Sequence, residues 1–155
     1  FYLLSDDISV VKPAEGKIWV YPSFPFLKLW RDVMDQVGFS PENGTRLRDP
    51  LEKYGYRMEK RFRADPVPLE RVFVLHVHNK EEYKTEQLKG VEKFNALKNQ
   101  TFRFQFVTDR NRKVHFSELN KMARAVQVYR VTRPQAPMDS DGLYQVIVRN
   151  LDQNA

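Results

Sequence analysis

An apolar segment at the start of the chain, Phe1 to Val11, is interrupted by two adjacent acidic residues, Asp6 and Asp7. Apolar runs rich in β-branched residues predict a strand, whereas aspartate is disfavoured in strands. Because successive side chains on a strand point to opposite faces, the two carboxylates cannot share one solvated side. At least one of them needs a cation, a hydrogen-bond donor or a cavity. Asp-Asp pairs are more often turn or cap residues, but the apolar flanks favour a functional site.

The composition indicates a globular chain that can build a core. Its 155 residues fit one domain, and hydrophobic residues make up 41% and aromatic residues 13% of the sequence, which argues against intrinsic disorder. No apolar run approaches the roughly 18 to 20 residues that span a bilayer, and nothing at the N-terminus resembles a signal peptide. We therefore expect no membrane partner. The chain has no cysteine, which excludes a disulfide framework and fits a cytoplasmic location.

Periodicity and turn residues predict strands and helices that alternate along the chain. Proline and glycine in residues 12–16 predict a hairpin turn, and apolar residues at helical spacing predict an amphipathic helix that ends at Gly38. Ser117 is a good N-cap for a later helix, and Pro134 and Pro137 form a stiff connector. We expect strands at 1–11, 18–21, 54–62, 71–78, 83–88 and 126–131, of which 71–78 is the clearest buried strand, and a half-buried strand or extended segment at 101–107. We expect helices at 26–37, 90–97, 118–125 and 143–151, with a polar loop at 40–50.

This order predicts an α/β or mixed α+β fold, with a mixed sheet and flanking helices, in a single domain over residues 1–155. The chain begins inside an expected strand, at Phe1. A core strand is a poor place for a domain boundary. We therefore expect further residues upstream.

Basic residues gather in residues 57–63 and 110–113 of a chain whose formal net charge is +6. Such clusters can bind a nucleic acid, a phosphorylated ligand or an acidic partner, although a solvated face is the commoner case. His76 and His78 face the same side of the expected strand 71–78, a spacing that can serve a metal. No third ligand is near in the sequence, so we expect two partly buried, hydrogen-bonded imidazoles there.

Four segments, taken in order, resemble the HPr kinase-like family. They are residues 3–11 (LLSDDISVV), 21–30 (YPSFPFLKLW), 66–75 (PVPLERVFVL) and 126–134 (VQVYRVTRP). Members of this family are related to the bacterial HPr serine kinase/phosphorylase and, in fold, to ATP-dependent phosphoenolpyruvate carboxykinase. The resemblance covers most of the chain and implies the downstream part of a phosphoenolpyruvate carboxykinase-like kinase domain.

The resemblance implies transfer of a phosphoryl group from ATP, with Mg²⁺, to a hydroxyl on a protein serine, a peptide or a small molecule. A triphosphate needs a divalent cation, and an alcohol nucleophile needs a carboxylate to take its proton. By position in the family pattern, Asp6 and Asp7 are the catalytic and metal-binding candidates. We favour Asp6 as the base and Asp7 as the metal ligand.

Four basic residues are further candidates for contacts with phosphate. Lys53 follows Pro50-Leu51-Glu52 and falls where relatives often carry a basic residue. The looser candidates are Arg57, Arg61 and Arg103, because guanidinium groups bind phosphate oxygens bidentately. Surface salt bridges are the default alternative for all four.

The family's glycine-rich phosphate-binding loop is absent from this sequence. Its pattern needs a glycine, four residues, then Gly-Lys and Ser or Thr. Gly16-Lys17 is followed by Ile18 and preceded five positions earlier by Val11, so it fails the pattern. We expect the loop to lie upstream in a longer kinase or to have been lost, and the isolated segment to be inactive.

The alternative function is a non-catalytic basic module that binds nucleic acid or an acidic protein. We do not expect nucleic acid as the partner, because the resemblance favours a nucleotide and a hydroxyl-bearing acceptor. The identity of the acceptor, the direction of transfer and assembly into a homo-oligomer stay open.

Overall fold

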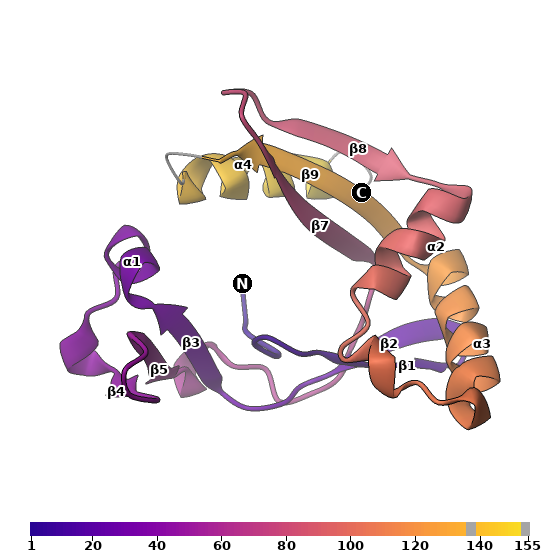
Figure 1. The fold of residues 1–155 in the computed structure, drawn as a ribbon, viewed down its shortest axis with the longest axis horizontal. Helices are drawn as coiled ribbons and strands as arrows, with labels where there is room; N and C mark the ends of the chain where they lie inside the picture. Colours follow the sequence, from indigo (N-terminus) through magenta and orange to yellow (C-terminus); the bar gives the residue numbers. More distant parts are fainter. Residues whose placement is uncertain (136–138, 153–155) are drawn as a thin grey trace. The chain divides into compact units, whose positions relative to one another are not determined.

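A computed structural model of the chain describes residues 1–135 and 139–152, which form strands and helices in a mixed α+β arrangement (Figure 1). This confirms the expected α+β class. The chain divides into two compact units: residues 1–12 with 19–68, and residues 13–18 with the chain from Leu69 onwards. The described part contains three three-stranded sheets.

The sheet of the first unit that carries the candidate site has the strand order β3-β5-β4. Strands β3 (Phe26–Trp30) and β4 (Thr45–Arg46) each pair antiparallel with β5 (Lys53–Arg57). The register opposes Lys28 to Gly55 and Trp30 to Lys53. Because side chains alternate across a strand, one face of this sheet carries Phe26, Lys28, Trp30, Lys53, Gly55 and Arg57.

Close packing fixes this sheet around two aromatic rings. A Cβ atom on Gly55 would lie 2.1 Å from Cζ of Phe26, so that ring lies directly against the glycine. On the other face, Tyr56 is 4% exposed, and its hydroxyl donates a hydrogen bond of 2.9 Å to the carbonyl of Ser40. Its ring lies edge-on to Phe39, with centroids 4.7 Å apart.

The expected strand over residues 1–11 is wrong for most of its length. Leu3 makes a single bridge with Phe62, Asp6 and Asp7 form a bend, and strand β1 begins at Val10 (Val10–Ala14). The acidic pair ends the extended conformation, as turn-forming aspartates do. Phe1 and Tyr2 are 88% and 69% exposed and do not form a buried strand.

The expected hairpin is confirmed. Strands β1 and β2 (Lys17–Tyr21) are neighbours in a sheet of order β1-β2-β6, where β6 is Val67–Pro68. Glu15 and Gly16 form the turn between β1 and β2 with φ angles of 53° and 74°. Two positive φ angles are typical of two-residue hairpin turns.

The expected helix over residues 26–37 is wrong in its first half. Residues 26–30 are strand β3, followed by one helical turn, α1 (Arg31–Met34), and a 3₁₀ turn, η1 (Asp35–Val37). The helical spacing of apolar residues also fits a strand, and pairing with β5 decides between them. Gly38 does end the helical segment, with φ 74°, as expected.

Two further expectations in the first unit need smaller corrections. In place of the expected strand 54–62, strand β5 ends at Arg57, and a 3₁₀ turn, η3 (Glu59–Arg61), follows it in the chain. The expected loop 40–50 contains a 3₁₀ turn, η2 (Pro41–Asn43), as well as β4.

The second unit has a sheet of order β7-β9-β8, with β9 in the centre (Figure 1). Strand β9 (Gln127–Pro134) pairs parallel with β7 (Arg71–His78) and antiparallel with β8 (Lys84–Leu88). Helices α2 (Gly90–Asn99) and α3 (Asp109–Ala125) lie between β8 and β9 in the chain, and α4 (Ser140–Asp152) follows β9. One hydrophobic cluster joins Ile18, Val74, Leu88, Leu97, Leu119, Val126 and Val128.

The three strands, α2 and α4 were expected near these positions, but three details differ. Strand β7 is buried at Val74, while Leu75 and Val77 are 51% and 54% exposed. Residues 101–107 are not a strand and include a 3₁₀ turn, η4 (Phe104–Phe106). Helix α3 begins at Asp109, so Ser117 lies inside it and is not the N-cap. Pro134 ends β9, and Pro137 lies outside the described residues.

The structure gives His76 and His78 no metal-binding arrangement. The expected partial burial is wrong for His76, which is exposed, whereas His78 is partly buried and its Nε2 lies 2.7 Å from the carbonyl oxygen of Glu82. Among residues 1–135 and 139–152, no group of three or more His, Cys, Asp or Glu side chains is arranged to hold a metal ion. Within the same residues, no helix is long and apolar enough to cross a membrane.

Candidate active site

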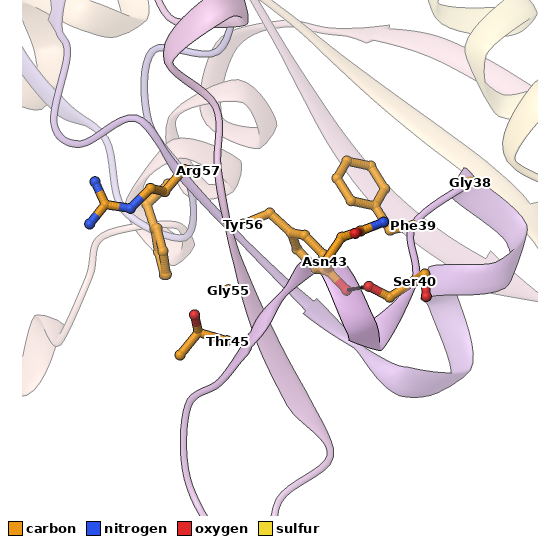
Figure 2. A pocket seen from close by; sticks show the side chains of 9 residues that line it. Gly38, Phe39, Ser40, Asn43, Thr45, Gly55, Tyr56 and Arg57 are labelled. Carbon is orange, nitrogen blue, oxygen red and sulfur yellow. Dashed lines mark hydrogen bonds between the residues drawn. The ribbon is translucent and has the colours of Figure 1, made fainter.

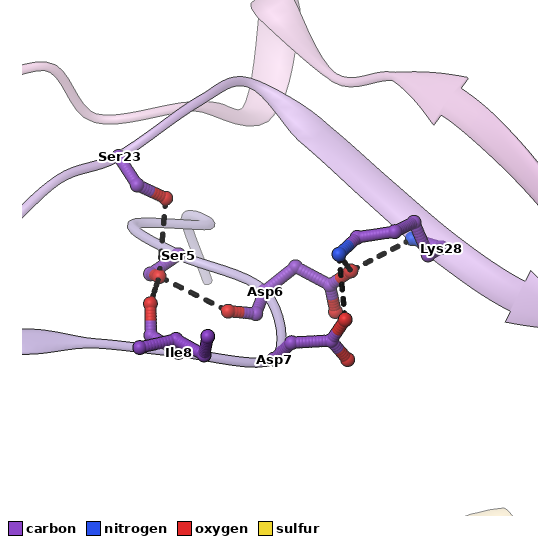
Figure 3. Close-up of polar contacts among 6 residues, drawn as sticks. All are labelled: Ser5, Asp6, Asp7, Ile8, Ser23 and Lys28. Atoms are coloured by element: carbon purple, nitrogen blue, oxygen red, sulfur yellow. Dashed lines mark hydrogen bonds and ion pairs between the residues drawn. The ribbon is translucent and has the colours of Figure 1, made fainter. Parts of the chain in front are cut away.

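Asp6 and Asp7 lie on a turn that is held by two serines (Figure 3). The Ser5 hydroxyl is within hydrogen-bonding distance of the carbonyl oxygens of Ile8 and Asp6, and the Ser23 hydroxyl donates to Ser5 Oγ over 3.1 Å. The N–H of Ile8 donates to the carbonyl of Asp6. Asp7 has φ 30°, in the left-handed region that aspartate tolerates better than most residues. The turn therefore presents two neighbouring carboxylates without a strand.

Lys28 contacts both carboxylates. Its ammonium nitrogen is 2.5 Å from Oδ2 of Asp7 and 3.9 Å from Oδ2 of Asp6. Its backbone N–H donates to Oδ2 of Asp6 over 3.0 Å. Lys28 lies on β3, which is an edge strand of its sheet, so Asp6 satisfies a backbone donor at that edge. The two acidic residues thus have different partners: Asp6 binds the backbone, and Asp7 binds the ammonium.

The ion pair shifts the protonation equilibria of both partners. The hydrogen bond from the Lys28 ammonium is the main reason that the pKa of Asp7 lies below its ordinary value, and the charge of Lys53 lowers it further. The hydrogen bond to Asp7 raises the pKa of Lys28. The lowered pKa makes Asp7 a weaker base, which suits a ligand for a cation better than a proton acceptor.

An open cavity of about 680 Å³ adjoins the pair. Its apolar wall includes Phe24, which is 75% exposed, and Val10, which is 49% exposed. A cavity with apolar walls and a few convergent charged groups is the usual form of a ligand site. The lining residues are Asp6, Asp7, Ile8, Val10, Ser23, Phe24, Pro25, Phe26, Lys28, Arg57 and Glu59.

A second cavity of about 680 Å³ lies in the same unit (Figure 2). It shares Phe26 and Arg57 with the first cavity and is otherwise lined by Gly38, Phe39, Ser40, Asn43, Thr45, Gly55 and Tyr56. Among these described residues, Arg57 alone is charged, and the Tyr56 hydroxyl already donates to Ser40. The cavity beside Asp6 and Asp7 is therefore the better candidate for acid–base chemistry.

Two of the four basic candidates, Lys53 and Arg57, lie on the sheet face that carries Lys28. The Lys53 ammonium lies 5.1 Å from the ring centroid of Trp30, on the sheet face that carries Lys28. Arg57 lines the cavity with a side chain that is 84% exposed, and its Nη1 is 3.5 Å from Oε1 of Glu59. Both could reach an anionic ligand without breaking a strong ion pair.

The other two basic candidates lie elsewhere. Arg61 is exposed on η3, where its carbonyl accepts a hydrogen bond of 2.7 Å from the N–H of Leu3. Arg103 belongs to the other unit. Its guanidinium carbon lies 5.0 Å from the ring centroid of Phe102 and 5.9 Å from that of Phe106.

Lys28 is the residue of this cluster that the sequence analysis did not identify. The expected helix over residues 26–37 gave it no special position. Residues 26–30 read FLKLW, in which a lysine stands alone among apolar residues. Had this segment been assigned as a strand after Pro25, a partly buried lysine would have indicated a nearby acidic partner.

No protein-family model matches the chain, and neither the curated proteins nor the solved structures contain a match to it.

Proposed function

We propose that the chain carries the carboxylate half of an ATP- and Mg²⁺-dependent phosphotransferase of the HPr kinase-like type, with a phosphoenolpyruvate carboxykinase-like fold. The acceptor is a hydroxyl on a protein, a peptide or a small molecule. The observation that carries the proposal is the pair Asp6 and Asp7, joined through Lys28 beside an open cavity. The order of the four resembling segments supports it, and the nucleotide cradle has to come from outside these 155 residues.

The two carboxylates divide the chemical tasks. In the transfer, the acceptor oxygen bonds to the γ-phosphorus, the bond from that phosphorus to the β,γ-bridging oxygen breaks, and ADP leaves. We assign the acceptor proton to the Asp6 carboxylate. Asp6 has a fixed position because the backbone N–H of Lys28 binds its Oδ2. The ammonium of Lys28 lowers the pKa of Asp7, so we assign Asp7 to the metal ion.

The donor set fits Mg²⁺. This ion is commonly bound in kinase sites by one or two carboxylates together with substrate phosphates, so a cage of three protein ligands is not required. Asp7, whose side chain is 50% exposed, can take the ion, with Asp6 beside it. The ion would neutralise the charge of the triphosphate. Lys53 and Arg57 can contact phosphate oxygens from the same sheet face, while Arg61 and Arg103 stay predictions.

Transfer of labelled phosphate from ATP by the full-length protein tests this proposal. We expect Asp6→Asn and Asp7→Asn each to lower transfer by about a hundredfold or more, the size of a general acid–base or metal contribution. Asp65→Asn is the matched control, because Asp65 is an exposed carboxylate outside the cavity. Retained transfer in both Asp6→Asn and Asp7→Asn would falsify the assignment.

A second candidate function is the binding of a polyanion by the other unit. Phe102, Phe104 and Phe106 are 41% to 65% exposed, and cations lie over their rings: Arg103 over Phe102 and Phe106, and Lys98 over Phe104. Exposed aromatic rings with cations can bind single-stranded nucleic acid. Affinity for an oligonucleotide that falls steeply with added salt would support this function. Salt-independent or absent binding would exclude it.

A further inference from the structure

We propose that Lys28 is a built-in counter-ion, which occupies the Asp6–Asp7 pair until a divalent cation displaces it. This inference rests on the proposed function and concerns how the same site is loaded. The ammonium nitrogen of Lys28 lies within 4 Å of both carboxylates. A divalent cation bound by the same oxygens would occupy nearly the same position, and two cations cannot share it.

The surrounding strands direct the side chain of Lys28 towards the carboxylates. The residue opposite Lys28 is Gly55, which has no side chain. The ring of Phe26 fills the space over that glycine, as the 2.1 Å distance from a Cβ on Gly55 to Cζ of Phe26 demonstrates. The ammonium of Lys28 thus lies on the side of Asp6 and Asp7, as Figure 3 shows.

The ammonium can leave without disturbing the turn. Asp6 is held by the backbone N–H of Lys28, and the turn itself is held by Ser5 and Ser23. The side chain of Lys28 is 33% exposed, so the ammonium is in contact with solvent where it lies. The site therefore keeps its carboxylates in place when the counter-ion is exchanged.

Replacement of the Lys28 ammonium by a divalent cation is favoured by the charge of the incoming ion. Surface ion pairs are weak, whereas a divalent cation interacts with each carboxylate about twice as strongly as an ammonium at the same distance. The displaced ammonium lies on the sheet face that also carries Lys53. There it can meet the phosphate oxygens of a metal-bound nucleotide.

Binding of Mn²⁺, followed by its electron paramagnetic resonance signal, tests the inference without any phosphate transfer. We expect Lys28→Met to bind Mn²⁺ about three- to tenfold more tightly than the wild type, because the competing ammonium is gone. The control is Lys12→Met, since Lys12 lies over the ring of Tyr21 and outside the cavity. Its affinity should equal that of the wild type. Adding Asp7→Asn to Lys28→Met should abolish the gain.

A second measurement uses the unmodified protein. Addition of Mg²⁺ should shift the nuclear magnetic resonance signal of the Lys28 side-chain methylene next to the ammonium, and should leave that of Lys12 in place. Equal or weaker Mn²⁺ binding by Lys28→Met, or an unmoved Lys28 signal, overturns the inference. If Lys28→Met binds Mn²⁺ more tightly and Mg²⁺ shifts the Lys28 signal, while the full-length protein transfers no phosphate, the proposed function fails and the inference stands. If the full-length protein transfers phosphate but Lys28→Met binds Mn²⁺ no more tightly than the wild type, the inference fails and the proposed function stands.

Discussion

The two units hold their strands together by different means. In the second unit the central strand β9 buries Val128 and Val131 completely, and Val128 belongs to a core that also includes Leu97 from α2 and Leu119 from α3. The first unit has short strands and few buried side chains, such as Met34 and Tyr56. Its turns are held by individual contacts of side chains with backbone groups. The second unit is therefore stabilised by shared packing in one core, whereas the first unit depends on individual contacts of side chains with backbone groups.

The largest effect is expected in the core of the second unit. Leu97→Ala should lower the free energy of unfolding by about 2–5 kcal/mol, because it removes a side chain that is 4% exposed and leaves a cavity. Urea unfolding followed by circular dichroism measures this loss. The matched control is Val91→Ala on the same helix, where Val91 is 75% exposed and the change should stay within about 0.5 kcal/mol. Equal losses in the two variants would contradict a continuous core.

A smaller loss is expected from Gly55→Ala in the first unit. The added Cβ would lie 2.1 Å from Phe26 and 2.9 Å from Leu47, and such overpacking typically costs about 1–3 kcal/mol. The chain's two tryptophans, Trp19 and Trp30, both belong to this unit. Tryptophan fluorescence during urea unfolding therefore reports on it directly.

The rescue variant for this change is the double substitution Gly55→Ala with Phe26→Leu. A shorter side chain at residue 26 makes room for the new Cβ and should recover part of the lost stability. If Gly55→Ala alone unfolds at the same urea concentration as the wild type, close packing of Phe26 on Gly55 does not stabilise this sheet.

The same contrast explains which elements could be predicted from the sequence. In the second unit, β7, β8, β9, α2 and α4 lie close to where the local patterns predict them, and the first four contribute Val74, Leu88, Val128 and Leu97 to the hydrophobic cluster. In the first unit, residues 26–30 have a pattern that fits a helix, and pairing of β3 with β5 overrides it. Such pairing joins residues as far apart in the sequence as Phe26 and Arg57, so local periodicity cannot reveal it.

The candidate site was predicted in part. The acidic pair was identified, and the expectation that at least one carboxylate needs a donor or a cation agrees with the contacts of Asp6 and Asp7. That expectation assumed that Asp6 and Asp7 lie on a strand, whereas the two residues form a bend. Lys28 was not identified, because its contact with Asp7 spans 21 residues and depends on β3 being a strand.

A still smaller effect is expected from Tyr56→Phe, which removes one buried hydroxyl. Loss of its hydrogen bond to the Ser40 carbonyl should cost about 1 kcal/mol. Burial raises the pKa of Tyr56 above 10.0, so the folded state favours the neutral phenol. That contribution is fully present below the pKa of the unfolded chain and is lost as the pH rises through the folded pKa.

Unfolding of the wild type and of Tyr56→Phe across the alkaline range checks this sign. The wild type should lose more stability than the variant as the pH rises above about 10. Tyr2→Phe is the control, because Tyr2 is 69% exposed. An equal alkaline loss in the wild type and in Tyr56→Phe would contradict the assigned cause.

The smallest effect on stability is expected at Asp7, one of the two residues whose substitution should strongly lower phosphate transfer. Asp7→Asn removes an exposed ion pair with Lys28, which is worth less than about 1 kcal/mol. The pKa of Asp7 is lowered from 3.8, so the stabilisation is present above that pH and is lost as the pH falls through the folded pKa. The difference in melting temperature between the wild type and Asp7→Asn should therefore be small at neutral pH and vanish in strong acid. A loss as large as that of Leu97→Ala would mean that Asp7 holds the unit together, and any loss of phosphate transfer in Asp7→Asn would then have a structural cause.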